Sequence, residues 1–358
     1  MKKTAVWGIL LTELIILLCG CKTAVPVKST SVSSLDSVSQ SIIQSEPETR
    51  TAVLCMTDIN HPVYRIVQLG FVDSARQLGY DWHILGKADA TPVEQRLEWF
   101  RGVKEYEADG ALCWVWDDTS YDFLKKVHGM GVKTAVLHFP HTYADTKEFI
   151  DVNVYPDLRA GAEIIAEFMV RELHDAGVYS GSIGIAINGS GCCSQEPEEV
   201  EVLRTYMAKR YPEYIVLSGA YESWGVEQSR QLMTEYILEN PDMVAVLDTT
   251  GGSVLSEAKQ AAGREDIVVV GYNNYTTLNL ELLDNGSIDA LLTQPLYKEA
   301  WFGMQLIDQL LEGQVFSRDE NLWRQSIAAP LIYSGGTGEH DPAYYEEQYV
   351  RSQGKFDR

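Results

Sequence analysis

Short apolar runs alternate with amphipathic segments along most of the chain. The first run, residues 52–56, is followed by a segment, 62–78, in which apolar residues recur at helical spacing until Gly79. Continuous apolar runs of this length are typical of strands that are buried on both faces of a parallel sheet. The pattern therefore predicts repeated strand–helix units.

The same alternation continues to about residue 311. The predicted strands are residues 52–56, 81–85, 110–116, 132–137, 149–152, 184–187, 215–217, 243–247, 267–270 and 288–292. Strands separated by longer helical patterns indicate βαβ units and parallel sheets. Because ten strands are too many for one small sheet, we predict an α/β fold with two doubly wound parallel-sheet lobes.

The N-terminus has the layout of an export signal. Lys2 and Lys3 precede a mainly apolar stretch, 5–18, which ends in Leu18-Cys19-Gly20-Cys21. The apolar stretch is short for a membrane span, and its ending resembles a bacterial lipobox. We therefore expect a signal peptide at 1–20 and a lipid on Cys21, which would attach the mature protein to the membrane. An ordinary secretory peptide and a membrane anchor remain alternatives.

Residues 22–50 are rich in polar residues and lack a sustained apolar period, which predicts a disordered tether within the segment 21–50. At the other end, residues 334–358 are polar and rich in tyrosine. We interpret them as a polar C-terminal tail, either weakly ordered or forming a short surface helix.

Composition excludes some classes of function. The chain has 358 residues, is 45% hydrophobic and carries a formal net charge of −22. Nucleic acid is therefore an unfavourable partner, because phosphate binding requires a basic face. Cys55 and Cys113 lie in apolar runs and are expected to be buried free thiols, whereas a vicinal disulfide between Cys192 and Cys193 stays open. The absence of CxxC gives no indication of a metal or redox framework.

Polar and aromatic residues gather where predicted strands end or helices begin. In an α/β sheet these positions converge on one crevice, where ligands bind. Aromatic planes suit the C–H faces of sugars, and amides or carboxylates suit paired hydroxyl groups. The candidate ligand-binding residues are His61, Tyr64, Asp117, His138, Phe139, Asn153, Trp224, Thr250, Asn273 and Gln294.

Two of these strand ends carry a recognisable motif. The sequence has Gly271-Tyr272-Asn273 after one strand and Gln294-Pro295 after the next. This arrangement resembles the type 1 periplasmic binding proteins, especially the ribose-binding cluster, where a Gly-aromatic-Asp ending is followed by Gln-x-Pro. The resemblance covers about residues 51–331 and implies that Asn273 and Gln294 hold the ligand.

The resemblance also carries other positions. It implies stacking roles for Tyr64 and Trp224 and a ligand contact for Asn153. His138 and Phe139 stand where the ribose-binding pattern has Asp-Arg, and Glu199 falls near a second Arg of that pattern. Because these charged residues differ, the resemblance implies the fold and does not imply ribose itself.

The expected protein is thus an extracytoplasmic, lipid-anchored solute-binding protein. Its N-lobe would comprise 51–153 and 295–326, and its C-lobe 154–294 and 327–333, joined by a three-segment hinge. It would close on a small polar ligand, with carbohydrate as the expected class, and deliver it to an ABC transporter permease.

Other functions are disfavoured or remain open. A ligand sensor that reports to a membrane histidine kinase or chemoreceptor is the alternative. A DNA-binding repressor is disfavoured, because an export signal stands where its DNA-binding helices would be. No nucleophile or acid–base motif indicates an enzyme. The Asn188–Gly191 loop and the pair His138 and His141 lack the spacing of a cofactor or metal site, so no cofactor and no metal are expected.

Overall fold

The computed structural model describes residues 49–115, 120–140, 148–187, 196–221, 226–249 and 253–356. The predicted signal peptide, Cys21 and the tether lie outside these ranges, as do Cys192 and Cys193. Within them, none of the helices is both long and apolar enough to cross a membrane. Cys55 and Cys113 are buried free thiols, as predicted. The pKa of Cys55 is raised, mainly by burial and also by a hydrogen bond to Cys113.

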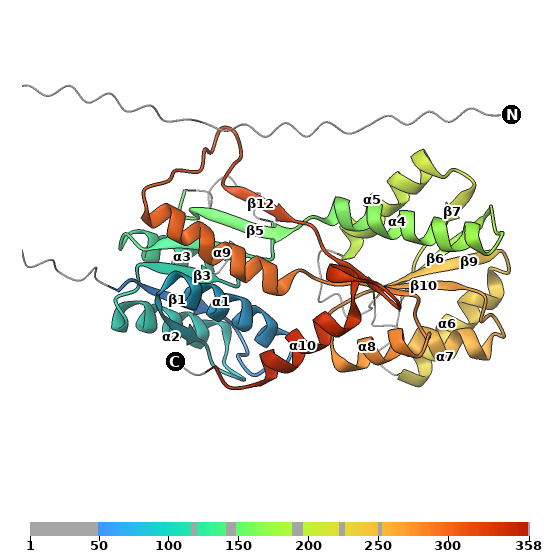
Figure 1. Cartoon of the computed structure of the whole chain (residues 1–358), viewed down its shortest axis with the longest axis horizontal. Helices are drawn as coiled ribbons and strands as arrows, with labels where there is room; N and C mark the ends of the chain where they lie inside the picture. Colours follow the sequence, from blue (N-terminus) through green and yellow to red (C-terminus); the bar gives the residue numbers. More distant parts are fainter. Residues whose placement is uncertain are drawn as a thin grey trace, which may run out of the picture. The chain divides into compact units, whose positions relative to one another are not determined.

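The first sheet forms the N-lobe and is parallel throughout (Figure 1). Its strands, in spatial order, are β12 (Arg324–Ile327), β5 (Val152–Pro156), β4 (Lys133–Leu137), β3 (Gly110–Cys113), β1 (Thr51–Cys55) and β2 (Asp81–Leu85). The helices of this lobe are α1 (Tyr64–Leu78), α2 (Pro92–Glu105), α3 (Tyr121–His128) and α9 (Leu296–Leu311). Helix α9 packs against α1 and against β3, β4 and β5.

The second sheet forms the C-lobe. Its strands, in spatial order, are β13 (Leu331–Tyr333), β11 (Ala290–Leu292), β10 (Val268–Tyr272), β9 (Met243–Asp248), β6 (Gly181–Ile187) and β7 (Tyr214–Val216), with β8 (Ala220–Tyr221) also paired to β6. Only β13 is antiparallel to its neighbour among these described strands. The helices are α4 (Leu158–Asp175), α5 (Glu196–Arg210), α6 (Val226–Glu239), α7 (Ser253–Ala261) and α8 (Thr277–Asp284). The predicted two-lobe α/β fold is confirmed.

The chain passes between the two sheets three times, as the predicted hinge requires. The passages follow β5, β11 and β12, which lead into α4, α9 and β13 respectively. Pro156 still pairs with Ile327 in the first sheet, so the first and third passages begin just after these residues. The first passage therefore lies a few residues later than the predicted boundary at residue 153.

The fifth predicted strand, 149–152, is wrong in position, because β5 begins at Val152. The preceding residues are held to the start of β4 by hydrogen bonds that involve side chains. The Thr134 backbone N–H donates to Asp151 at 2.8 Å, and the Thr134 hydroxyl donates to the Phe149 carbonyl at 2.9 Å. These side-chain bonds replace a strand ladder, and an apolar pattern does not reveal them.

The C-terminal segment forms a helix, which is one of the two alternatives that the sequence left open, and this helix packs on both lobes. A short 3-10 turn, η2 (Gly338–His340), leads into α10 (Pro342–Gln353), which Asp341 caps through the Ala343 N–H. Helix α10 contacts α1 of the N-lobe and α8 of the C-lobe (Figure 1). It therefore links the two lobes in addition to the three chain passages.

Both sides of this link are made by specific contacts. On the α1 side, Arg65 donates to the Ser352 carbonyl at 2.8 Å, and Arg351 lies 2.7 Å from Asp73. On the α8 side, the Tyr275 hydroxyl donates to Gln348 at 3.0 Å. Burial raises the pKa of Tyr275 well above its usual value, so this phenol remains a hydrogen-bond donor at neutral pH.

Candidate ligand-binding site

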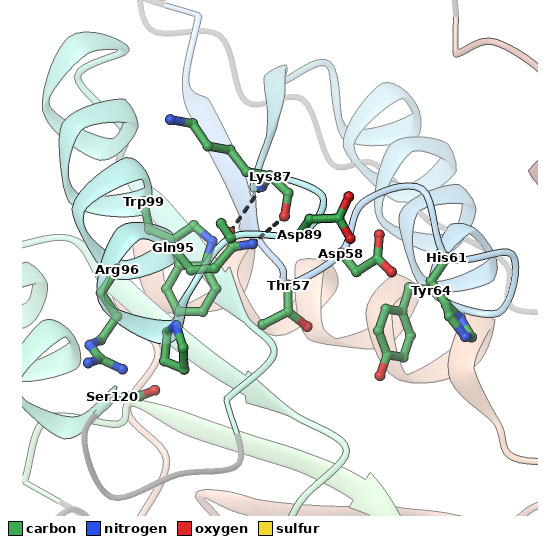
Figure 2. Close-up of a pocket in the computed structure, with 12 residues that line it drawn as sticks. Thr57, Asp58, His61, Tyr64, Lys87, Asp89, Gln95, Arg96, Trp99 and Ser120 are labelled. Carbon is green, nitrogen blue, oxygen red and sulfur yellow. Dashed lines mark hydrogen bonds between the residues drawn. The ribbon is translucent and has the colours of Figure 1, made fainter.

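A polar pocket of about 310 Å³ lies at the carboxyl ends of β1 and β2 and beside the start of α3. Figure 2 shows Asp58, His61 and Tyr64 on one side of it and Gln95, Arg96 and Trp99 on the other. The remaining lining residues are Thr57, Lys87, Asp89, Ala90, Pro92 and Ser120. Strand ends of a parallel sheet are the usual place for a ligand in this class of fold.

The α2 side of the pocket is fixed by hydrogen bonds to the strand ends. The Gln95 side chain accepts from the Lys87 N–H at 3.0 Å and donates to the Lys87 carbonyl. The Trp99 indole N–H donates to the Met56 carbonyl at 2.9 Å. These side chains are therefore part of the wall and hold the two loops that carry the polar lining residues.

Five aromatic residues form a ring cluster next to the pocket. It consists of His61, Tyr64, Trp114, His138 and Phe139. The ring centroids of His61 and Tyr64 are 4.6 Å apart, those of Tyr64 and Trp114 are 5.5 Å apart, and those of Trp114 and His138 are 4.5 Å apart. Phe139 meets Trp114 and His138 edge to face. The cluster joins four of the predicted ligand-binding residues to Trp114, which the sequence placed inside a strand.

Glu299 lies beneath this cluster, at the start of α9. Its side chain is fully buried, and its Oε2 is 3.1 Å from His138 Nδ1. Sequence reasoning did not single out Glu299, because an acidic residue in the first turn of a helix is ordinarily exposed. The available signal was an acid on the face of an amphipathic helix that also carries the buried residues Ala300 and Gly303.

Asn153 is fully buried in β5. Its side-chain amide donates to the carbonyls of Val136 and Phe139, each at 3.0 Å. These bonds hold the turn after β4, which carries His138 and Phe139. A direct contact between Asn153 and a ligand stays a prediction.

Asn273 in the C-lobe and Gln294 at the passage into α9 are both half-buried. The Asn273 side-chain oxygen accepts from the Asn274 N–H at 2.7 Å, which closes a local turn. Gln294 lines a small cavity beneath α10 together with Tyr275 and Pro295. Their roles as ligand-binding residues stay predictions.

The remaining candidates cannot be placed. Asp117, Trp224 and Thr250 lie outside the described residues, as does the side chain of Glu199. In the part of the chain that the structure describes, no group of three or more His, Cys, Asp or Glu side chains could hold a metal ion.

Comparison with known proteins identifies the family of this chain. Residues 52–314 match the periplasmic binding protein domain family. The chain belongs to this family. The match ends just after α9, so β12, β13 and α10 lie beyond it.

Two relatives have curated names. A D-ribose/D-allose-binding protein of Pseudomonas aeruginosa is 27% identical over 164 residues, which is 45% of this chain and 49% of that protein. The match thus spans about half of that relative. A D-apiose import binding protein of Actinobacillus succinogenes is 25% identical over 269 residues, covering 73% of this chain and 82% of that protein.

Solved structures share the fold of this family member. AraP, an arabinose binding protein from Geobacillus stearothermophilus, matches with a TM-score of 0.67 at 15% identity, over 84% of this chain and 99% of that one. XylFII in a XylFII–LytSN complex matches with a TM-score of 0.59 at 15% identity, over 81% of this chain and 100% of that one.

Proposed function

We propose that this periplasmic binding protein captures a carbohydrate on the N-lobe surface formed by the ring cluster and the adjoining polar pocket. The observation that carries the proposal is the placement of Tyr64 in both, since its ring lies 5.5 Å from that of Trp114 and it also lines the pocket. A sugar has apolar C–H faces and hydroxyl edges, and aromatic rings beside polar side chains match both.

The named relatives support a sugar ligand, because both are named for binding pentoses or hexoses. The C-lobe would supply the opposing contacts through Asn273 and Gln294. Closure of the two lobes about the three passages would then enclose the ligand, driven by its greater affinity for the closed state.

Delivery of the sugar to an ABC transporter permease is the function that best fits the relative named as an import binding protein. In this proposal Cys21 carries a lipid that keeps the protein at the outer face of the cytoplasmic membrane, where the permease would receive the ligand. Binding requires neither a cofactor nor a catalytic residue.

A sensor is the second candidate. Its support is the likeness of fold to XylFII, which was solved in a complex with LytSN. In this alternative the ligand-bound lobes would contact a membrane-bound partner without transport. Deletion of a neighbouring permease gene or kinase gene, where one is found, would separate the two functions by which loss abolishes the response to the sugar.

A thermal-shift screen of the protein from residue 22 onward tests the proposed ligand class. At least one of D-ribose, D-allose, D-apiose and related sugars should raise the stability, by about 2.7 kcal/mol at a concentration one hundred times its Kd. Tyr64→Ala should abolish most of the shift, whereas Tyr179→Ala, at a tyrosine that is 65% exposed, should preserve it. A panel of sugars, polyols, amino sugars and nucleosides that leaves the parent protein unshifted would rule out the proposal.

A second experiment tests the anchor. Cys21→Ser should leave the precursor uncleaved or release the protein from the membrane, because serine offers no thiol for lipid attachment. Membrane fractionation and the mass of the N-terminal peptide measure this. A Cys21→Ser protein that is trimmed after Gly20 and stays with the membrane would exclude Cys21 as the anchor.

A further inference from the structure

Glu299 is a costly residue at its position. The Glu299 side chain is 0% exposed and that of His138 is 6% exposed, so both groups of the pair have left water. Desolvation of a buried acid–base pair commonly cancels the gain from its attraction, and replacement by apolar residues is often neutral or stabilising. Stability of the fold alone therefore does not explain this pair.

The partner of Glu299 is also strained. His138 has a φ of 75°, in the left-handed region that disfavours residues with a Cβ. Such strain is characteristic of functional sites, where the surrounding structure holds it in place. The buried acid Glu299 thus contacts a residue with a strained backbone, His138, directly after β4.

The contact between Glu299 and His138 sets the orientation of the His138 ring. His138 Nδ1 lies 3.1 Å and 3.4 Å from the two Glu299 oxygens. Because an ionised carboxylate only accepts hydrogen bonds, Glu299 in that form favours the His138 tautomer that carries its proton on Nδ1. This contact fixes the plane of the imidazole. The ring lies nearly parallel to Trp114, with an interplanar angle of 13°.

Trp114 depends on its ring contacts. It is only 3% exposed, and its indole N–H has no hydrogen-bond partner among the residues that the structure describes. It contacts His138 on one side and Tyr64 on another, and Tyr64 lines the polar pocket. The orientation of His138 therefore affects that of Tyr64 in the pocket through the His138–Trp114 and Trp114–Tyr64 ring contacts.

We propose that Glu299 is a positioning residue of the ligand site. It holds His138 in the Nδ1–H form and thereby sets the planes of Trp114 and Tyr64 before a ligand arrives. A preorganised wall binds more tightly, because fewer side chains must be ordered on binding. This inference rests on the proposed function, in which the ring cluster receives the sugar.

Two substitutions of Glu299 test the inference. Glu299→Gln retains an oxygen that can accept from His138 Nδ1–H, whereas Glu299→Leu retains volume and removes the acceptor. We expect D-ribose, or the sugar with the largest thermal shift, to bind several-fold more weakly to Glu299→Gln and more than about tenfold more weakly to Glu299→Leu. Calorimetry measures the affinities, and Glu281→Gln and Glu281→Leu, at an exposed glutamate of α8, should leave them unchanged.

Stability separates positioning from a merely structural role. Glu299→Leu leaves the buried His138 without its acceptor and should lose stability as well as affinity, whereas Glu299→Gln should unfold close to the parent's urea concentration while its affinity falls several-fold. A loss of affinity that simply follows a loss of stability, and that Glu299→Gln does not partly restore, would overturn the proposal.

Nuclear magnetic resonance supplies a readout that needs no ligand. With histidine and tryptophan labelled with ¹⁵N, Glu299→Leu should shift the His138 Nδ1 signal from the protonated form and move the Trp114 indole signal. Unchanged signals in this variant would refute the positioning role even if sugar binding were confirmed. A parent protein that binds no sugar would refute the proposed function while this spectroscopic result still decides the role of Glu299.

Discussion

Tyr345→Ala is expected to lower the free energy of unfolding of the segment that contains α10 by about 3–5 kcal/mol, as large-to-small changes at buried aromatic rings do. Tyr345 is 3% exposed, its ring meets Tyr275 at 4.9 Å, and its hydroxyl donates to the Glu339 carbonyl at 2.9 Å. Truncation removes the ring that seats α10 against the C-lobe. Helix α10 should then separate from the C-lobe more easily, while its contacts with α1 remain.

Hydrogen exchange and urea denaturation measure this effect. Amides of α10 should lose protection in Tyr345→Ala before the sheets do, since local opening requires less free energy than global unfolding. Val350→Ala is the matched control on the same helix, because Val350 is 63% exposed and surface changes of this kind stay within about 0.5 kcal/mol. Equal protection in the two variants would show that Tyr345 does not seat the helix in solution.

Asn153→Ala should destabilise the N-lobe by about 2–6 kcal/mol, since it would leave one buried and one partly buried carbonyl without their amide donor, at roughly 1–3 kcal/mol each. The carbonyls belong to Val136 and Phe139, and Asn153 itself is fully buried. The turn that carries Phe139 would loosen, so sugar affinity should fall as well. Urea denaturation and calorimetry measure the two losses.

Asn285→Ala provides the comparison for Asn153. Its side chain accepts one exposed hydrogen bond, from the Ser287 N–H at 2.9 Å. Water can replace that bond, so the expected cost is well below that at Asn153. If Asn153→Ala lost affinity at unchanged stability, Asn153 would be a ligand contact and its backbone bonds would be dispensable.

Much of the fold was open to prediction because local signals and tertiary packing agree. Thr91 followed by Pro92 is typical of a helix start, and in the structure Thr91 caps α2 and forms a capping box with Glu94. The apolar run at 267–270 has no alternation, and β10 is buried within its sheet. A short-range pattern and a buried strand have the same cause here, which is exclusion of water from both faces of the sheet.

The limits of such prediction appear where side chains far apart in sequence decide the structure. The start of β5 depends on Thr134 and Asp151, and the packing of α10 depends on Tyr275. A polar segment such as 334–358 lacks the periodic apolar stripe of a packed helix, because much of its binding to the lobes comes from hydrogen bonds and tyrosine rings. Local sequence does not encode the partners of those groups.

The order of apolar and polar positions was sufficient to predict the parallel sheets, the two lobes and the strand ends where polar residues collect. Buried faces of strands and helices leave a regular apolar pattern along the chain. The ring cluster, by contrast, draws Tyr64, Trp114 and His138 from three separate strand–helix connections. Glu299 joins it from a helix more than a hundred residues further on, at a separation of 161 from His138. Only folding brings these groups within hydrogen-bond and ring-contact distance, because such contacts act over a few ångströms in space and leave no period along the chain.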